Sequence, residues 1–208
     1  MRTVVQIILA IVIVFLGYTL VKNIMKPIKF QEEVNKREKA IIARLIDIRK
    51  AQEAFKEKYG KYTGSFDTLI NFVKTDSFEI PRKDYLPGWD PDLYTEEQGI
   101  KKGLIKISIT KKSVLDSLFG KNYNVDELRY VPFTKDYQFT MQAGELTSSS
   151  GIKVKVFEAY ALYDSILKGL DPQLVINYIY EKEKIMKFPG LKVGSIKEFT
   201  NNAGNWEK

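Results

Sequence analysis

The sequence contains no cysteine and no histidine among its 208 residues. Without cysteine there is no disulfide framework, thiolate nucleophile or thiolate metal site. Without histidine the chain lacks the commonest general base and the commonest zinc ligand, and it cannot form a Ser-His-Asp or Cys-His arrangement. The two absences exclude a large share of enzyme chemistry. We therefore expect a protein that is not an enzyme, with no catalytic, cofactor-binding or metal-binding residues and no cofactor.

Basic residues are in excess in only one part of the chain. The net charge is +7, and residues 22–61 hold twelve Lys and Arg against six Asp and Glu, whereas residues 62–208 hold twenty of each sign. A nucleic-acid-binding domain carries its basic residues on the folded surface. A basic stretch beside an apolar run indicates an orientation signal or a contact with anionic lipid, here near Lys22, Lys26 and Lys29. We expect no nucleic-acid partner.

A single long apolar run extends from Val4 to Val21 and contains no charged residue. As a helix its eighteen residues would span about 27 Å, close to the roughly 30 Å hydrocarbon core of a bilayer. A cleaved signal peptide has a shorter apolar core followed by a small-x-small site, and residues 17–22 offer no such site. We expect a retained transmembrane anchor at residues 4–21, preceded by a short tail, residues 1–3, with the membrane as a partner.

The side of the membrane follows less directly from the charges. Lysines after the apolar run outnumber the basic groups before it, which under the positive-inside rule favours a cytoplasmic domain. A short positive tail leading straight into an apolar run is also how an uncleaved export signal begins. We favour export, which makes this a single-pass inner-membrane protein with a periplasmic domain.

Beyond the anchor we expect Pro27 to interrupt or kink the helix, because proline lacks an amide donor and clashes with the preceding turn. A second helix is predicted over residues 31–59. Apolar residues recur along one side of it, namely Val34, Ile41, Leu45, Ile48, Phe55 and Tyr59, with Ile42 and Ile46 beside them. Glu38 and Gln52 occupy the complementary heptad positions and weaken a coiled-coil seam. We favour a helix that packs on its own domain over a dimeric coiled coil.

The remaining sequence predicts helices and strands in turn. Gly60 ends the long helix, and Ser65 caps a short helix over residues 66–74. Residues 80–103 are rich in Pro and Gly and predict an irregular segment. The other predicted elements are a strand at 104–110 with one buried face, a capping box at Ser113–Asp116, a turn at Asn124, a hairpin of 130–134 with 137–142, a strand at 152–156 and a helix from Asp171-Pro172 to Lys187.

Together these elements predict an α+β fold. The expected organisation is an anchor at residues 4–21, a basic amphipathic juxtamembrane helix at 22–61, and a soluble α+β domain at 62–208. In this arrangement the long helix packs on an antiparallel sheet, and a helix lies near the C-terminus.

The chain resembles two families. Its order of apolar helix, proline, amphipathic helix, Tyr59–Tyr62 and Ser65–Leu69, followed by a sheet, is similar to the plan of type IV pilins and pseudopilins. It differs from prepilins in having Gln6 as its early polar residue, where they carry a glutamate. The stretches KYTGSFDTLINFVK, LRYVPFTKDYQF and KFPGLKVGS resemble an uncharacterised family of bacterial single-pass envelope proteins, which implies an envelope location.

Three local motifs lack the residues or the spacing that would be needed to assign a chemical activity. Ser165 and Lys168 match S-x-x-K, but the companion motifs of the penicillin-binding enzymes are missing. The carboxylates of residues 90–97 lack EF-hand spacing, so we interpret them as a solvated loop, with Trp89 and Tyr94 folding back more readily than forming a contact patch. Residues 190–195 lack the order of a phosphate loop and predict a turn and short strand.

The sequence therefore favours a non-enzymatic, membrane-anchored structural or assembly component of a bacterial envelope complex. Its partners would bind at sheet edges by strand addition, or through helix packing in the membrane. The alternative is a membrane-tethered ligand-binding or sensory domain, which needs a pocket lined by the aromatic residues of 80–100 and the sheet.

Overall fold

The computed structural model describes residues 2–207 of the chain. They group into two compact units, which we call the anchor unit (residues 2–49 and 128–207) and the ribbon unit (residues 50–127). The fold is α+β, with a long N-terminal apolar helix and two small antiparallel sheets. The expected single sheet is therefore wrong.

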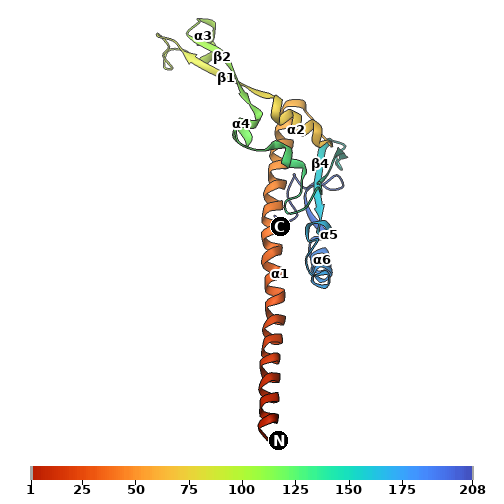
Figure 1. The fold of residues 1–208 in the computed structure, drawn as a ribbon. Helices are drawn as coiled ribbons and strands as arrows, with labels where there is room; N and C mark the ends of the chain where they lie inside the picture. The colour runs from red at the N-terminus through yellow and green to blue at the C-terminus, as the bar shows by residue number, and fades with distance from the viewer. Residues whose placement is uncertain (1, 208) are drawn as a thin grey trace. The chain divides into compact units, whose positions relative to one another are not determined.

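Helix α1 extends from Arg2 to Tyr59 without a break, as the continuous coil in Figure 1 shows. The predicted interruption at Pro27 is wrong. Proline removes one hydrogen bond, to the carbonyl of Asn23, and leaves the bonds of the flanking turns intact. Residues 1–3 are expected to form a short tail, but Arg2 and Thr3 belong to this helix. Met1 lies outside the described residues.

The first part of α1 fits a single-pass membrane protein. It is the one helix among residues 2–207 that is long and apolar enough to cross a membrane, and none of its most apolar segment is buried within the chain. The apolar side chains from Ile7 to Val21 are exposed, including Phe15 and Leu16. An apolar surface of this length is stable only in a lipid or protein environment.

The anchor unit contains a three-stranded antiparallel sheet in the order β3–β4–β5. Its elements are β3 (Thr140–Thr147), β4 (Lys153–Leu162), α5 (Tyr163–Ile166), α6 (Pro172–Met186) and β5 (Gly190–Gly194). The central strand β4 buries Phe157, Ala159 and Ala161 completely. The predicted strand at 152–156 is confirmed in place but is longer, and Ile152 lies outside it and is exposed.

Helix α6 forms where its caps predict it. Asp171 accepts hydrogen bonds from the amides of Gln173 and Leu174, Pro172 takes the first helical position, and Lys187 ends the helix with a φ of 54°. It is not the last element, because the chain continues into β5, the short strand that the sequence predicts. The residues after β5 return to it through Asn205, whose side chain bonds Gly190 and Lys192.

The apolar stripe of α1 is buried by its own chain. Within the anchor unit Val34, Ile41, Leu45 and Ile48 have no exposed surface. This confirms the preference for a helix packed on its own chain. The hydrogen bonds of α1 in this unit reach α5, α6 and the C-terminal segment: Arg37 donates to the carbonyl of Ile166 (2.8 Å), and Arg49 donates to Glu207 (2.9 Å).

The ribbon unit begins with the last turns of α1 and continues through one sheet of two strands. It contains α2 (Phe66–Thr75), β1 (Ser77–Tyr85), α3 (Glu96–Lys101), β2 (Ile105–Ser113) and α4 (Val114–Leu118), and η1 (Val125–Arg129) begins at its end. Phe55, Leu69, Phe72 and Val73 form its core. Ser65 caps α2 as predicted, by accepting from the amide of Thr68. Tyr59, expected in the buried stripe, is half exposed and donates to Asp76.

Buried Gln52 is a polar member of this unit. Its side-chain amide donates to the carbonyl of Thr63 (2.6 Å) and accepts from the Thr63 amide (3.1 Å). This pair ties the turn after α1 back onto the helix, which explains a polar residue on an otherwise apolar face.

Other predicted elements need correction. Residues 80–103 contain most of β1 and all of α3, so the predicted irregular segment is confirmed only between these elements, at residues 86–95. Pro81 is tolerated because β1 has a partner on one side only. Residues 130–134 do not form a strand, because a single bridge, Tyr130 with Gln138, is followed by a tight loop with positive φ at Phe133 and Asp136.

Helix α4 forms, but the side chain of Ser113 makes no capping bond. The turn at Asn124 is confirmed.

Candidate protein-binding edge

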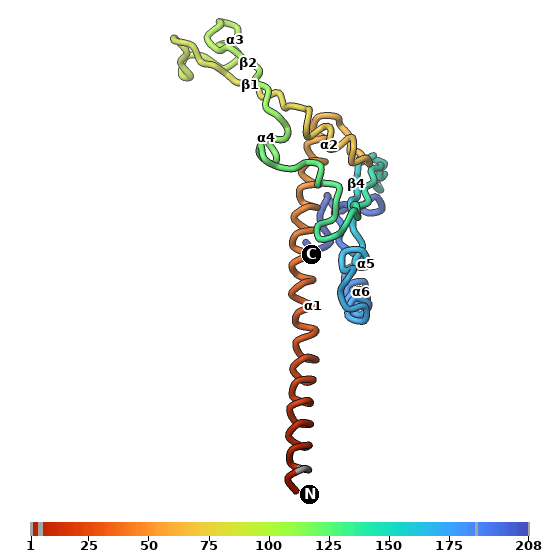
Figure 2. Tube along the Cα trace, in the orientation of Figure 1, coloured from red at the N-terminus to blue at the C-terminus, as the bar shows by residue number. Residues whose placement is uncertain are grey.

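Strands β1 and β2 form a ribbon of nine residue pairs, from Ser77 opposite Ser113 to Tyr85 opposite Ile105. The trace in Figure 2 follows the two strands side by side. Two backbone bonds bracket the ladder: the Leu86 amide donates to Leu104 (2.9 Å) and the Val114 amide donates to Asp76 (3.0 Å). Hydrogen-bonded and non-hydrogen-bonded pairs alternate in an antiparallel ladder. Even-numbered residues therefore bond across the ribbon, and odd-numbered residues turn their amides outward.

The two outer edges of the ribbon differ because of one residue. Pro81 is odd-numbered, so its missing amide falls on the outer edge of β1, where it interrupts the row of donors. On β2 the outward positions are Ile107, Ile109 and Lys111, and all three carry an amide hydrogen. Within the described residues no third strand pairs with either edge. Thus β2 offers an unbroken donor and acceptor row, and β1 does not.

Apolar side chains accompany the open edge of β2. Ile107 is 50% exposed and Ile109 is 64% exposed. They lie on the same face as Lys83 and Pro81, the residues opposite them. The sequence predicts that this alternating face is buried, which is wrong for both isoleucines. Covering their exposed parts would contribute about 1–2 kcal/mol each.

The end of the ribbon at Tyr85 and Ile105 has its own small core. Ile105 is buried, and a Cβ on Gly99 of α3 would lie 2.3 Å from the Trp89 ring and 2.8 Å from Ile105. The helix therefore needs glycine there to let Trp89 and Ile105 approach. Trp89 folds back, as expected, and its ring lies 5.7 Å from that of Tyr85. The ring of Tyr94 has Lys102 above it at 3.9 Å.

The charge of β2 indicates which kind of partner its edge would accept. Strand β2 carries Lys106, Lys111 and Lys112 and no acidic residue. Opposite charges on neighbouring strands stabilise a sheet, and like charges directly opposite destabilise it. The edge therefore suits an extended segment that carries Asp or Glu.

The acidic loop before α3 makes bonds within the ribbon unit. Asp90 accepts from the amide of Asp92 (2.9 Å), and Glu96 pairs with Lys83, which lowers the pKa of the Glu96 carboxyl. Among residues 2–207 no group of three His, Cys, Asp or Glu side chains could hold a metal ion. The arrangement gives no support to a cation site.

The other two local motifs have different surroundings. Ser165 and Lys168 line an open cleft of ≈ 780 Å³ in the anchor unit, together with residues 133–137 and Asp164. Gly190 and Gly194 belong to β5, and a Cβ on either would lie 2.2 Å from a carbonyl oxygen of β4. These glycines serve close strand packing and not phosphate binding.

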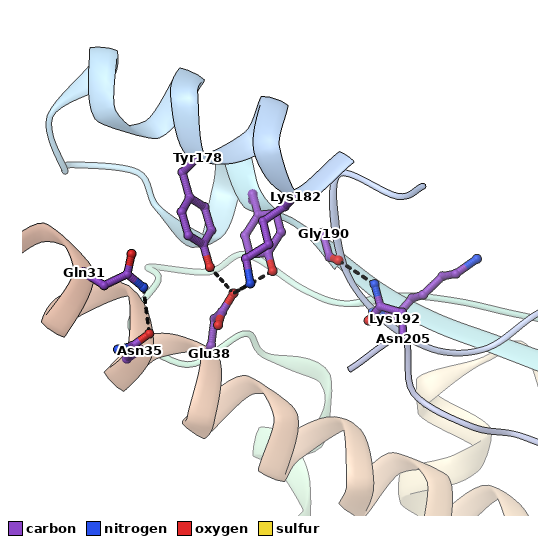
Figure 3. A network of polar contacts seen from close by, with 9 residues as sticks. Gln31, Asn35, Glu38, Tyr178, Lys182, Gly190, Lys192 and Asn205 are labelled. Carbon is purple, nitrogen blue, oxygen red and sulfur yellow. Dashed lines mark hydrogen bonds and ion pairs between the residues drawn. The ribbon is translucent and has the colours of Figure 1, made fainter. Parts of the chain in front are cut away.

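A partly buried carboxylate joins α1 to α5 and α6 in the anchor unit (Figure 3). Glu38 accepts hydrogen bonds from the hydroxyls of Tyr163 (2.6 Å) and Tyr178 (2.7 Å), and the amine of Lys182 lies 3.9 Å away. Burial raises the pKa of both phenols far above the ordinary value, and the bonds to Glu38 raise it further. Both tyrosines therefore stay protonated and donate. The sequence shows Glu38 only as an interruption of the heptads, since its partners are 125 and 140 residues away.

Comparisons of the chain with protein-family models, with curated proteins and with solved structures gave no match. The geometry of the β2 edge and of the anchor is therefore the basis for assigning a function.

Proposed function

We propose that this chain is a non-enzymatic, single-pass membrane protein that holds a partner protein in a cell-envelope assembly. The partner adds an acidic extended segment to the outer edge of β2. The observation that carries the proposal is the unpaired edge itself, with exposed Ile107 and Ile109 along it. An isolated two-stranded ribbon is at best marginally stable in water, and a third strand would stabilise it.

Proline substitutions at the two edges test this proposal. Ile109→Pro removes one outward amide of β2 without removing a bond between β1 and β2, and Glu79→Pro does the same on β1. Each protein is extracted from its native membranes in mild detergent and sized by native electrophoresis. We expect the wild type and Glu79→Pro to migrate as one larger complex and Ile109→Pro to migrate as the free chain.

A second variant covers the case in which Ile109→Pro fails to fold. Ile107→Glu with Ile109→Glu keeps every backbone donor but replaces the exposed apolar face with negative charge, which repels an acidic segment, so it should also release the partner. A complex that survives both β2 variants, or one that Glu79→Pro disrupts equally, would refute strand addition at β2.

The location of the domain is part of the proposal. We place the chain in the inner membrane with both units in the periplasm, on the pattern of an uncleaved export signal. Alkaline phosphatase fused after the last residue is active only if exported, and a fluorescent protein at the same place folds only inside. Active phosphatase supports the envelope role and the resemblance to pilins. A fluorescent fusion with inactive phosphatase would contradict both and favour a cytoplasmic scaffold.

A second candidate function is ligand binding or sensing by the tethered domain. The cleft of ≈ 780 Å³ favours it, although it lies beside residues 133–137 and not at residues 80–100 as expected. Ser165→Trp would place a large ring in this cleft. A small molecule that raises the melting temperature of the wild type but not of this variant would support the second candidate.

A further inference from the structure

Helix α1 carries three lysines on one face just beyond its apolar run. Tyr18, Val21, Lys22, Met25, Lys26 and Lys29 line a shallow groove of ≈ 380 Å³ along the helix. Its first part is apolar and its second part is basic. This order matches an anionic phospholipid, whose acyl chains lie in the core and whose phosphate lies at the surface.

The helix rise sets the depth of these lysines. If residues 4–21 fill the hydrocarbon core, Lys26 lies about 7–8 Å beyond Val21 along the axis and Lys29 about 12 Å beyond it. The headgroup layer is roughly 5–7 Å thick on each side. Long lysine side chains reach several ångströms back along the helix, so all three amines can reach phosphate groups.

One of the three lysines already has a protein partner. The Lys26 amine lies 2.7 Å from the carboxylate of Asp171, which also caps α6 by accepting from the amides of Gln173 and Leu174. The ion pair therefore holds the first turn of α6 at the level of Lys26. The loop before it is fixed too, because Arg37 donates to the carbonyl of Lys168 (3.2 Å).

The other two lysines of the groove have no carboxylate partner. Lys22 and Lys29 are exposed, and within residues 2–207 no ion pair joins either of them to a carboxylate. Lys168 belongs to a different level of the helix, because its carbonyl bonds Arg37, which lies about 24 Å beyond Val21. The base of the anchor unit thus presents Lys22 and Lys29 toward the headgroups, with Lys26 neutralised.

We propose that Lys22 and Lys29 bind the phosphate groups of anionic phospholipids, while the Lys26–Asp171 ion pair holds the start of α6 against the headgroup layer. The surface is a lipid-recognition site of the domain and not only an orientation signal. It rests on the membrane anchoring of the proposed function but does not depend on the β2 edge.

Lipid selectivity of the full chain in vesicles tests this inference. Spin-labelled phosphatidylglycerol and spin-labelled phosphatidylcholine report how strongly each lipid associates with the protein. We expect phosphatidylglycerol to be preferred, and each of Lys22→Gln and Lys29→Gln to lower the preference about fivefold. Lys39→Gln is the matched control, because it removes the same charge about 27 Å beyond Val21, more than two Debye lengths away. It should leave the preference unchanged, as should added inorganic phosphate.

Asp171→Asn tests whether the ion pair keeps Lys26 from binding lipid. Asparagine still caps α6 but no longer pairs with Lys26, so a third lysine becomes available to lipid. We expect the preference for phosphatidylglycerol to rise about fivefold. Equal association of the two lipids with the wild type, or equal losses in Lys22→Gln and Lys39→Gln, would overturn the proposal.

The depth of α6 gives an independent measurement. Because the chain has no cysteine, Gln173→Cys and Glu183→Cys each create a unique position for a nitroxide. We expect the label at 173 to report headgroup depth and the label at 183 to report water. Two water-exposed labels would refute the placement of α6. Resistance of the chain to alkaline carbonate extraction is measured first, so that a failure of anchoring is distinguished from a failure of lipid recognition.

Discussion

Strands β2 and β4 have similar sequence patterns but opposite surroundings. Both alternate apolar residues with polar or charged ones over part of their length. In β4, Phe157 and Ala159 are fully buried, whereas in β2 Ile107 and Ile109 are at least half exposed. The difference is that β4 pairs on both sides, with β3 and β5, and β2 pairs only with β1. Alternation identifies a strand and its two faces, but it does not say which protein covers the apolar face.

The comparison also explains where glycine is found. Strand β5 approaches β4 so closely that Gly190 and Gly194 have no room for a Cβ. The β1–β2 ribbon contains no glycine in either strand. Close approach to β4 therefore accounts for the two glycines of β5, whereas Gly144 of β3 has open space around it.

The largest contrast should come from a charge placed in each region. Ile41→Asp puts a carboxylate into the buried stripe of α1 and should lower the free energy of unfolding by more than about 4 kcal/mol. Ile109→Asp should change it by less than about 0.5 kcal/mol, because the side chain is exposed. Urea unfolding followed by circular dichroism in detergent measures both. Equal losses would show that the ribbon face is part of a core.

Glycine substitutions in the β3–β4–β5 sheet should lower the stability by a smaller amount. Gly190→Ala places a methyl group 2.2 Å from the carbonyl oxygen of Ala161, and we expect a loss of about 2–4 kcal/mol. Gly144→Ala in β3 is the control, since its Cβ would meet nothing within 4 Å. Thermal unfolding of the two variants should differ clearly. A tolerated Gly190→Ala would contradict the close approach of β5 to β4.

Removing one hydrogen bond from the Glu38 network should have an intermediate effect. Tyr178→Phe takes away a donor to a partly buried carboxylate and should cost about 1–3 kcal/mol. Tyr180→Phe, two residues away, is the control because that side chain is 61% exposed. Urea unfolding compares the two. Indistinguishable variants would mean that the network contributes nothing to holding α6 on α1.

The smallest effect concerns pH in the ribbon unit. Hydrogen bonds from Lys58 and Tyr59 lower the pKa of the Asp76 carboxyl below its usual range near 4. The contribution of Asp76 to folded stability is therefore fully present above about pH 5 and is lost as the pH falls through the lowered pKa. Because the pair is partly exposed, the loss should be at most about 1 kcal/mol. Asp76→Asn should abolish this part of the acid dependence, measured by urea unfolding between pH 2 and 6.

Local signals in the sequence predict much of the fold. Ser65 and Asp171 are helix caps in the structure, and the α1 stripe from Val34 to Ile48 is buried. Two predictions that rested on proline residues were wrong, at least in part. Pro27 costs a single bond in a helix stabilised on both sides, and the missing amide of Pro81 faces an edge with no partner strand. Neither outcome follows from proline chemistry alone.

The candidate sites depend on pairings that no local pattern contains. The openness of β2 follows from the absence of a third strand among the described residues, and the Lys26–Asp171 ion pair joins residues 145 positions apart. Glu38 has an ordinary position in the sequence and meets two buried tyrosines only after α5 and α6 fold onto α1. These features required the three-dimensional arrangement.

The central claim is that β2, and not β1, receives a partner strand. The most direct measurement is photo-crosslinking in living cells, with a photoreactive amino acid at Thr110 of β2 or at Ile80, opposite it on β1. We predict that Thr110 forms a discrete adduct with a single partner protein, that Ile109→Pro abolishes this adduct, and that Ile80 forms none. Adducts of equal yield from both strands, or an adduct at Thr110 that persists in Ile109→Pro, would contradict strand addition at the β2 edge.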